Sequence, residues 1–196
     1  MQRIYFALMI CWGFFFQQAA FAQDEKKSEF SIQAGLNWNN PIVEEDEFIT
    51  DSKAGYQIGL SYMRGKHFWW QTGLHYYHLA STFVPVNSSV IGDVSYSEIK
   101  VPLLAGLSLL PTTNDVFNIR VFAGALPGVV VGKKTDDKLN IEEDDMSGFH
   151  FDPTIGLDVD VLIVSARVGY SYGISGILKD YKSNPSYVYL YLGIGF

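Results

Sequence analysis

The feature that most constrains this chain is an alternation of apolar and small polar residues with a period of two. At residues 187–196 the aliphatic side chains occupy every second position, and Tyr or Gly residues stand between them. Neighbouring side chains of a β-strand point to opposite faces of the sheet, so this period predicts strands rather than helices. Eight segments follow the pattern, at residues 29–39, 54–63, 68–77, 98–109, 119–131, 149–161, 162–173 and 187–196.

The polar face of these segments carries mostly Gly, Ser, Gln and Asn, with only a few charged residues. A soluble barrel such as a lipocalin has an apolar interior and needs a charged, solvated exterior. The composition favours the opposite arrangement, in which small polar side chains fill a narrow interior and the apolar face meets lipid. Aromatic residues mark both ends of the apolar face, as in the two interfacial girdles of membrane barrels. They are Trp38, Tyr56, Tyr76, Phe151 and Tyr172 at one end, and Phe30, Tyr62, Phe68, Trp70 and Phe196 at the other.

The connections between the segments alternate in length. Long polar connections span residues 40–53, 79–93, 132–148 and 173–186, and shorter ones span residues 64–67, 111–118 and 160–163. An even number of strands, with long loops on one side and short turns on the other, is typical of bacterial outer-membrane barrels. The sequence therefore predicts an all-β fold, an eight-stranded antiparallel up-and-down transmembrane β-barrel.

The first 22 residues have the pattern of a secretory signal peptide. Arg3 precedes an apolar run over residues 4–16, and Ala20-Phe21-Ala22 forms a small-residue cleavage site. The apolar run is shorter than the ~20 residues that a membrane-spanning helix needs. We expect cleavage after Ala22, which leaves residues 23–196 as the barrel domain. The single cysteine, Cys11, lies in the leader, so we expect no disulfide in the mature protein.

The chain is acidic, and the acids are clustered. It has 21 Asp and Glu against 14 Lys and Arg, a formal net charge of −7 at pH 7. This charge repels phosphates, so we expect no nucleic-acid partner. Two acidic clusters, at residues 44–47 and 136–145, fall in long connections and lack the spacing of a calcium-binding loop. We therefore predict solvated loops, with no metal and no cofactor. The alternative is a weak Ca²⁺ site in the second cluster, whose carboxylates are suitable oxygen ligands.

Charged residues on the polar face of the strands form a second pattern. A charge that faced lipid near the middle of the bilayer would cost about 2–4 kcal/mol, so these residues are expected to face the lumen and to pair there. An ion path is one interpretation. The one favoured here is a structural salt-bridge plug, because eight strands leave room only for side chains. The predicted network consists of Lys100, Arg120, Asp158, Asp160 and Arg167.

The histidines were considered as catalytic residues. His75 and Ser61 lie on neighbouring strands, but both are predicted on the lumen face, away from any lipid substrate. His67 falls in a turn, His78 at a loop edge, and His150 beside a loop. No strand-to-helix nucleophile elbow is predicted, and the sequence reveals no lipid-facing Ser–His pair. We therefore expect no catalytic residues and no enzymatic activity.

Two prolines fall inside predicted strands. Proline has no N–H to donate to the ladder, so Pro102 and Pro127 each predict a bulge or a local break in pairing.

Several stretches resemble the PorT-like outer-membrane β-barrel family of Bacteroidota. They are YSEIKVPLLAGLSL, RVFAGALPGVVVG, FDPTIGLDVDVLIVSARVGYSYGISGI and the final LYLGIGF, within the C-terminal two-thirds of the chain. The family typically has a Glu-Ile/Leu-Pro-Leu run in its fourth strand, but here Lys100-Val101 stands between Ile99 and Pro102. Asp152 and Gly156 match the family pattern of the sixth strand, and Pro153, Thr154 and Asp158 depart from it. The resemblance implies fold and location, and it brings no catalytic set.

Together these observations predict a barrel in the outer membrane of a Gram-negative bacterium, with both termini in the periplasm. The function favoured is non-enzymatic, a structural or interaction role in the cell envelope. The alternatives are a narrow porin-like pore and a lipid-modifying enzyme. Expected partners are outer-membrane lipid, another envelope protein and the barrel assembly machinery. The resemblance implies that this machinery recognises an assembly signal in the last strand, made of Val188, Leu190, Leu192, Ile194 and Phe196.

Overall fold

A computed structural model describes residues 28–40, 42–43, 48–85, 92–110, 116–135, 147–175 and 183–196. Within these ranges, no helix is long and apolar enough to cross a membrane. The predicted signal peptide and the acidic clusters at residues 44–47 and 136–145 lie outside the described residues.

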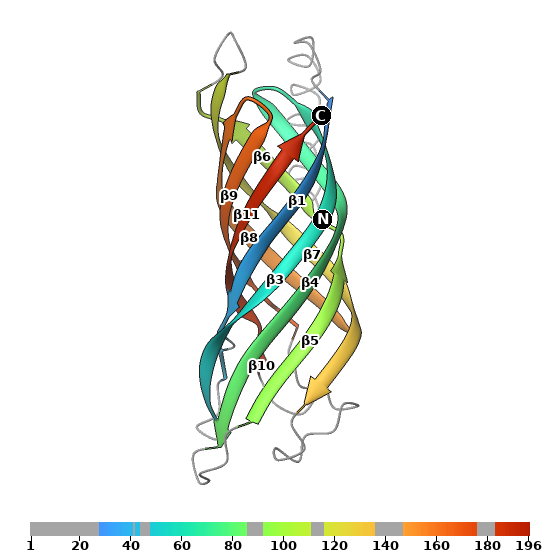
Figure 1. Ribbon diagram of the computed structural model, residues 1–196, viewed down its shortest axis with the longest axis vertical. Coiled ribbons are helices and arrows are strands. Elements are labelled where there is room, and N and C mark those ends of the chain that lie inside the picture. The colour runs from blue at the N-terminus through green and yellow to red at the C-terminus, as the bar shows by residue number, and fades with distance from the viewer. Residues whose placement is uncertain are drawn as a thin grey trace, which may run out of the picture.

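The described chain is a closed antiparallel β-barrel (Figure 1). Its strands are β1 (Ser28–Asn39), β3 (Phe48–Gly65), β4 (Phe68–Pro85), β5 (Gly92–Lys100), β6 (Leu103–Ser108), β7 (Phe117–Thr135), β8 (Phe149–Val161), β9 (Val164–Tyr172) and β11 (Ser186–Gly195). Because β5 and β6 follow one another between β4 and β7, they count as one interrupted strand, and the barrel is eight-stranded. The predicted fold class is confirmed. Two short strands, β2 (Ile42–Val43) and β10 (Ser183–Asn184), pair separately.

The barrel closes where β11 pairs with β1. The register runs from Ser31 opposite Gly195 to Asn39 opposite Tyr187, and β1 pairs on its other side with β3. At the end of the seam, Phe30 and Phe196 exchange two backbone hydrogen bonds of 3.1 and 2.8 Å. This end also carries the β3–β4 and β8–β9 turns, and we call it the turn end; the opposite end is the loop end (Figure 1).

The break between β5 and β6 occurs at Val101-Pro102, as predicted. The register against β7 continues unchanged across it, from Lys100 opposite Gly128 to Leu103 opposite Ala125. The Val101 N–H donates to the Pro127 carbonyl (2.9 Å), but Pro127 has no N–H to return. Pro127 itself remains inside β7. The two prolines therefore remove ladder hydrogen bonds without shifting the strands.

The two faces of the strands are inverted relative to a soluble protein, as the composition predicted. Leu192 on the outer face is 61% exposed, whereas the neighbouring Tyr191 inside is 3% exposed. All five residues of the predicted assembly signal lie on the outer face, with exposures from 43% for Leu190 to 74% for Phe196. The described structure places this stripe toward lipid; its recognition by assembly machinery stays a prediction.

Inside the barrel, several glycines are covered by an aromatic ring from the next strand. A Cβ atom at Gly169 would lie 2.3 Å from the Tyr189 ring, and one at Gly156 would lie 2.5 Å from Phe122. Gly106 meets Trp69 in the same way at 2.6 Å. The missing side chains thus give the large rings a place to lie flat against the wall, which lets a narrow lumen hold them.

The assignment of faces leads to a first prediction. Leu192→Arg places a charge on the lipid-facing stripe, at a cost of about 2–4 kcal/mol near the bilayer centre. We expect less folded barrel in membrane fractions, read from heat-modifiable migration on a gel. Leu192→Ala is the control, because it removes bulk without adding charge. Normal assembly of Leu192→Arg would show that this face does not meet lipid.

Candidate functional site

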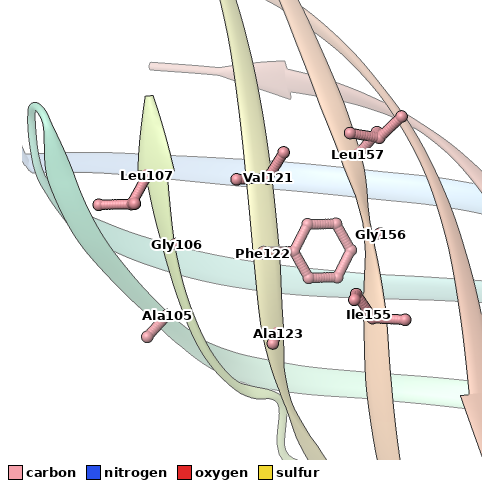
Figure 2. A pocket seen from close by; sticks show the side chains of 9 residues that line it. All are labelled: Ala105, Gly106, Leu107, Val121, Phe122, Ala123, Ile155, Gly156 and Leu157. Atoms are coloured by element: carbon pink, nitrogen blue, oxygen red, sulfur yellow. The ribbon is translucent and has the colours of Figure 1, made fainter. Parts of the chain in front are cut away.

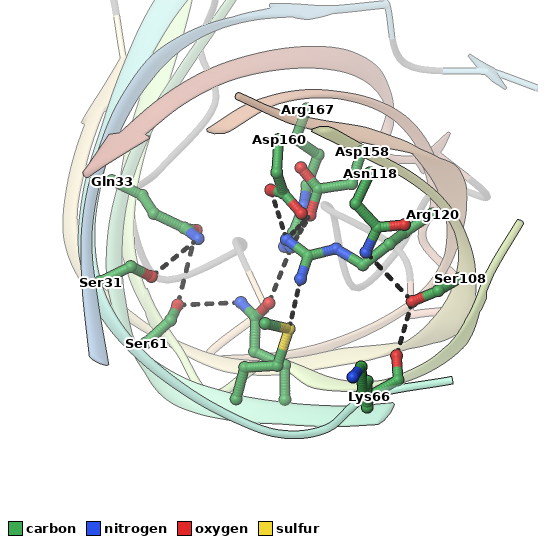
Figure 3. A network of polar contacts seen from close by, with 12 residues as sticks. Ser31, Gln33, Ser61, Lys66, Ser108, Asn118, Arg120, Asp158, Asp160 and Arg167 are labelled. Carbon is green, nitrogen blue, oxygen red and sulfur yellow. Dashed lines mark hydrogen bonds and ion pairs between the residues drawn. The ribbon is translucent and has the colours of Figure 1, made fainter. Parts of the chain in front are cut away.

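The charged residues of the lumen gather in two separate clusters. The first, the turn-end cluster, consists of Arg120, Asp158, Asp160 and Arg167 (Figure 3). The Nη2 atom of Arg120 lies 2.5 Å from Asp160 and 3.3 Å from Asp158, and Nη2 of Arg167 lies 2.7 Å from Asp158. Asp158 therefore bridges both guanidinium groups. Strand register brings them together, since Asp158 stands opposite Arg120 on one side and Arg167 on the other.

Uncharged groups complete the turn-end cluster. Arg167 donates to the side-chain oxygen of Gln71 (2.7 Å), and Arg120 contacts the Met63 sulfur at 2.9 Å (Figure 3). The guanidinium groups also lie over aromatic rings, Arg120 at 5.3 Å from Trp69 and Arg167 at 4.8 Å from Phe122. Both cations are thus held on several sides, and they fill this level of the lumen.

Lys100 belongs to a second group, the loop-end cluster, and not to the predicted network with the arginines. Its ammonium group pairs with Glu98 at 2.7 Å and with Asp152, and it donates to the Tyr187 hydroxyl at 3.1 Å. His150 binds the other oxygen of Glu98. The separation follows from register, because Arg120 stands opposite Ser108. Ser108 lies eight residues from Lys100 along the interrupted strand made of β5 and β6. At ~3.4 Å per residue that is about 27 Å along the strand.

A layer of tyrosines fills the lumen between the clusters. Tyr187, Tyr189 and Tyr191 are successive inward residues of β11, and Tyr77 faces them from β4. All four are at most 3% exposed. The hydroxyls of Tyr77 and Tyr191 bond to each other, and Tyr189 bonds Thr154 at 2.9 Å. Along its described length the lumen is therefore filled by side chains.

Ser61 and His75 form a hydrogen-bonded pair inside this core. The Ser61 hydroxyl lies 2.7 Å from Nε2 of His75, and Nδ1 of His75 lies 2.9 Å from the Tyr191 hydroxyl. Both residues point into the lumen, as predicted, and they are 3% and 2% exposed. A buried pair of this kind cannot meet a substrate. His150, expected beside a loop, is also buried, at 1% exposure.

Sequence reasoning missed a polar group on the outer face. Nδ1 of His78 lies 3.1 Å from the Ser97 hydroxyl, and the Tyr76 hydroxyl donates to the same oxygen at 2.8 Å. From the sequence, His78 is predicted at a loop edge, and Ser97 falls outside the predicted strand segments. Register joins them, since Ser97 of β5 stands directly opposite His78 of β4. The expected absence of a lipid-facing Ser–His pair is therefore wrong for this part of the barrel.

The outer face also has two shallow depressions. One of about 430 Å³ lies over β6, β7 and β8 (Figure 2). It is lined only by apolar residues and glycines, so it offers no chemistry. The other, of about 310 Å³, lies over β3, β4 and β5 next to Tyr76. Over the described ranges, no group of three or more His, Cys, Asp or Glu residues is placed to hold a metal ion.

Comparison with protein-family models and with curated proteins finds no match. Solved structures do match. OprG from Pseudomonas aeruginosa aligns with a TM-score of 0.51 and 12% identity, over 89% of this chain and 98% of OprG. Ail, the attachment invasion locus protein of Yersinia pestis, gives 0.50 and 14%, over 87% and 99%. The outer membrane enzyme PagL gives 0.47 and 17%, over 85% and 98%. The likenesses to OprG and Ail show the fold alone, a closed eight-stranded β-barrel of the outer-membrane type.

The bridging role of Asp158 leads to a second prediction. Arg167→Met leaves Asp158 with only the more distant Arg120, and breaking a buried pair in this way costs about 3–5 kcal/mol. Arg167→Met combined with Asp158→Asn should lose less stability than Arg167→Met alone, because no unpaired charge remains. The measurement is urea unfolding in lipid vesicles, followed by tryptophan fluorescence.

The matched control is the exposed pair of Lys53 and Asp93, at 2.5 Å. Lys53→Met should change the free energy of unfolding by less than about 1 kcal/mol. Losses at Arg167 and Asp158 that simply add would count against the pairing.

Proposed function

We propose that this chain is a closed outer-membrane barrel with a structural or interaction role in the envelope of a Gram-negative bacterium. The observation that carries the proposal is the filled lumen. The turn-end cluster, the tyrosine layer and the loop-end cluster follow one another along the barrel and leave no described level without packed side chains. A barrel of this kind presents only its outer face, its turns and its loops to other molecules.

A porin-like pore is disfavoured by the same packing. A conducting barrel needs a water-filled path through its lumen, and eight strands give an interior just wide enough for side chains. Here the charged groups pair with one another at 2.5–3.3 Å in the turn-end cluster. We also assign no catalytic role to the lumen, because Ser61 and His75 are covered.

The orientation forms part of the proposal. The described chain begins and ends at the turn end, while β1, β4, β7 and β9 finish at the loop end (Figure 1). We place the turn end in the periplasm and the acidic loops outside. Lipid then covers the belt of aliphatic residues, the assembly machinery binds the stripe from Val188 to Phe196, and another envelope protein binds the loops or turns. The acidic charge argues against nucleic acid.

The filled lumen predicts little or no steady ion current from purified barrel in planar lipid bilayers. A general porin serves as the positive control for insertion and detection. Heat-modifiable migration of the same sample confirms that the protein is folded. A large, steady open channel in most insertions would overturn the closed-lumen proposal.

The orientation is tested by labelling single cysteines in intact cells with a large maleimide–polyethylene glycol. Gly148→Cys lies at the loop end, where an added Cβ has no heavy atom within 4 Å, and His67→Cys lies in the exposed β3–β4 turn. We expect label on Gly148→Cys in intact cells, and on His67→Cys only after the outer membrane is opened. The reverse result would invert the barrel.

A further inference from the structure

The Tyr76, His78 and Ser97 group on the outer face has the geometry of an activated serine. A nucleophile and its base act at a separation of about 2.6–3.2 Å, and the Ser97 hydroxyl lies 3.1 Å from Nδ1 of His78. With the neutral imidazole protonated at Nε2, Nδ1 accepts the serine proton. The Tyr76 hydroxyl donates to the same serine oxygen at 2.8 Å and thereby positions it.

The imidazole of His78 is fixed by its neighbours. The ring stacks on Tyr56 with centroids 5.1 Å apart and an interplanar angle of 29°. From inside the barrel, the Asn37 side-chain amide donates to the His78 backbone carbonyl at 3.3 Å. Tyr56 also lies beside Tyr76, at 6.2 Å between centroids. Stacking on Tyr56 therefore holds the imidazole, and the Asn37 hydrogen bond holds the backbone that carries it.

The serine is open to the membrane. His78 and Ser97 are both partly exposed, in contrast to the buried Ser61 and His75. On the β7 side Ser97 faces Gly132, where even an added Cβ would remain 3.9 Å from the serine oxygen. A register shift at this point gives β7 one extra residue, Val131, against β5. Bulges of this type occur next to active sites, where they re-aim side chains and take residues out of the ladder.

An apolar groove lies beside the serine, on the side of the bilayer centre. It is the 310 Å³ depression over β3, β4 and β5, and its volume lies at the lower end of the ~300–1,000 Å³ found for ligand sites. Its walls include Ile58, Leu74, Tyr76 and Ile99. Tyr76 and Ile99 form the next outward-facing pair after His78 and Ser97, on the side of the turn end. Since Tyr76 and Ile99 also line the groove, the groove adjoins the polar group. One lipid acyl chain fits this shape and polarity.

The Tyr76, His78 and Ser97 group lies at the depth in the bilayer at which the ester bonds of lipids lie. Tyr56 and Tyr76 belong to the aromatic girdle of the loop end, and such girdles lie at the level of the lipid headgroups. An ester that joins an acyl chain to its headgroup lies at the same level, with the chain pointing to the bilayer centre. We propose that Ser97 and His78 form a lipid-facing site that hydrolyses ester-linked acyl chains of membrane lipids. This activity goes beyond the proposed envelope role.

The chemistry is acyl transfer through the serine. The Ser97 oxygen bonds to the ester carbonyl carbon while its proton passes to Nδ1 of His78. The bond from that carbon to the alcohol oxygen then breaks, and His78 returns the proton to the leaving oxygen. Water attacks the acyl-serine, gives a proton to His78 and releases the fatty acid, and the proton restores the Ser97 hydroxyl. The products are a fatty acid and a lipid with one chain fewer.

The test uses the purified, folded barrel in mixed micelles, with phosphatidylethanolamine in one arm and lipopolysaccharide in the other. Released fatty acid is measured by mass spectrometry. We expect release in at least one arm, which identifies the lipid, and a loss of about 100-fold or more in Ser97→Ala and in His78→Gln. A fluorophosphonate should add to the protein and map to Ser97. Ser95→Ala is the matched control, because Ser95 lies on the same outer face one row away, and it should keep full activity.

The groove has its own variant. Ile99→Trp fills it next to the serine, so release of long acyl chains should fall about 10-fold or more. All variants are compared by heat-modifiable migration, so that loss of fold is seen separately. No release in either arm, release that Ser97→Ala does not reduce, or a fluorophosphonate adduct elsewhere would overturn the site. These assays do not depend on orientation or on a closed lumen, so their failure leaves the proposed function standing.

Discussion

The backbone hydrogen bonds of a chain in hydrocarbon must all be made within the protein, because lipid offers no partner. The seam between β1 and β11 meets this demand, and the rest of the structure depends on it. The closed barrel has eight strands, and this small number gives it a narrow circumference. It also explains why two prolines are tolerated. The register passes through Val101-Pro102 unchanged, so the ladder is weakened locally and the ring of strands stays intact.

A narrow closed ring must be filled, and the filling combines large rings with paired charges. Tyr189 and Phe122 lie flat over glycines of the next strand, which leaves the centre for long polar side chains. Arg120 and Arg167 enter only because Asp158 bridges them and aromatic rings cover them. The same arrangement places many polar side chains of the described strands inside the barrel, whereas Tyr76, His78 and Ser97 form a polar group on its outer face.

The sequence alone predicts the faces of the strands but not their neighbours across the sheet. Faces follow from a period of two, so the exposure of Leu192 and the burial of Tyr191 could be read directly. Neighbours depend on the stagger between strands and on bulges, which no single segment encodes. Lys100 was therefore grouped with Arg120, although register separates them. The contact between His78 and Ser97 was missed because the predicted segments end at residue 77 and begin at residue 98, whereas β4 and β5 extend past these points and place the two residues opposite each other.

The two charge clusters, with the tyrosines between them, follow one another along the lumen. An ion would have to pass both clusters, so loosening one cluster leaves the other to block ions. Each cluster is also anchored to different strand levels, Lys100 beside Gly128 and Arg120 beside Ser108. Under the closed-lumen proposal, a substitution at one end of the lumen leaves the permeability barrier in place. Such a barrel can lose side-chain order at either mouth without becoming a leak in the cell envelope.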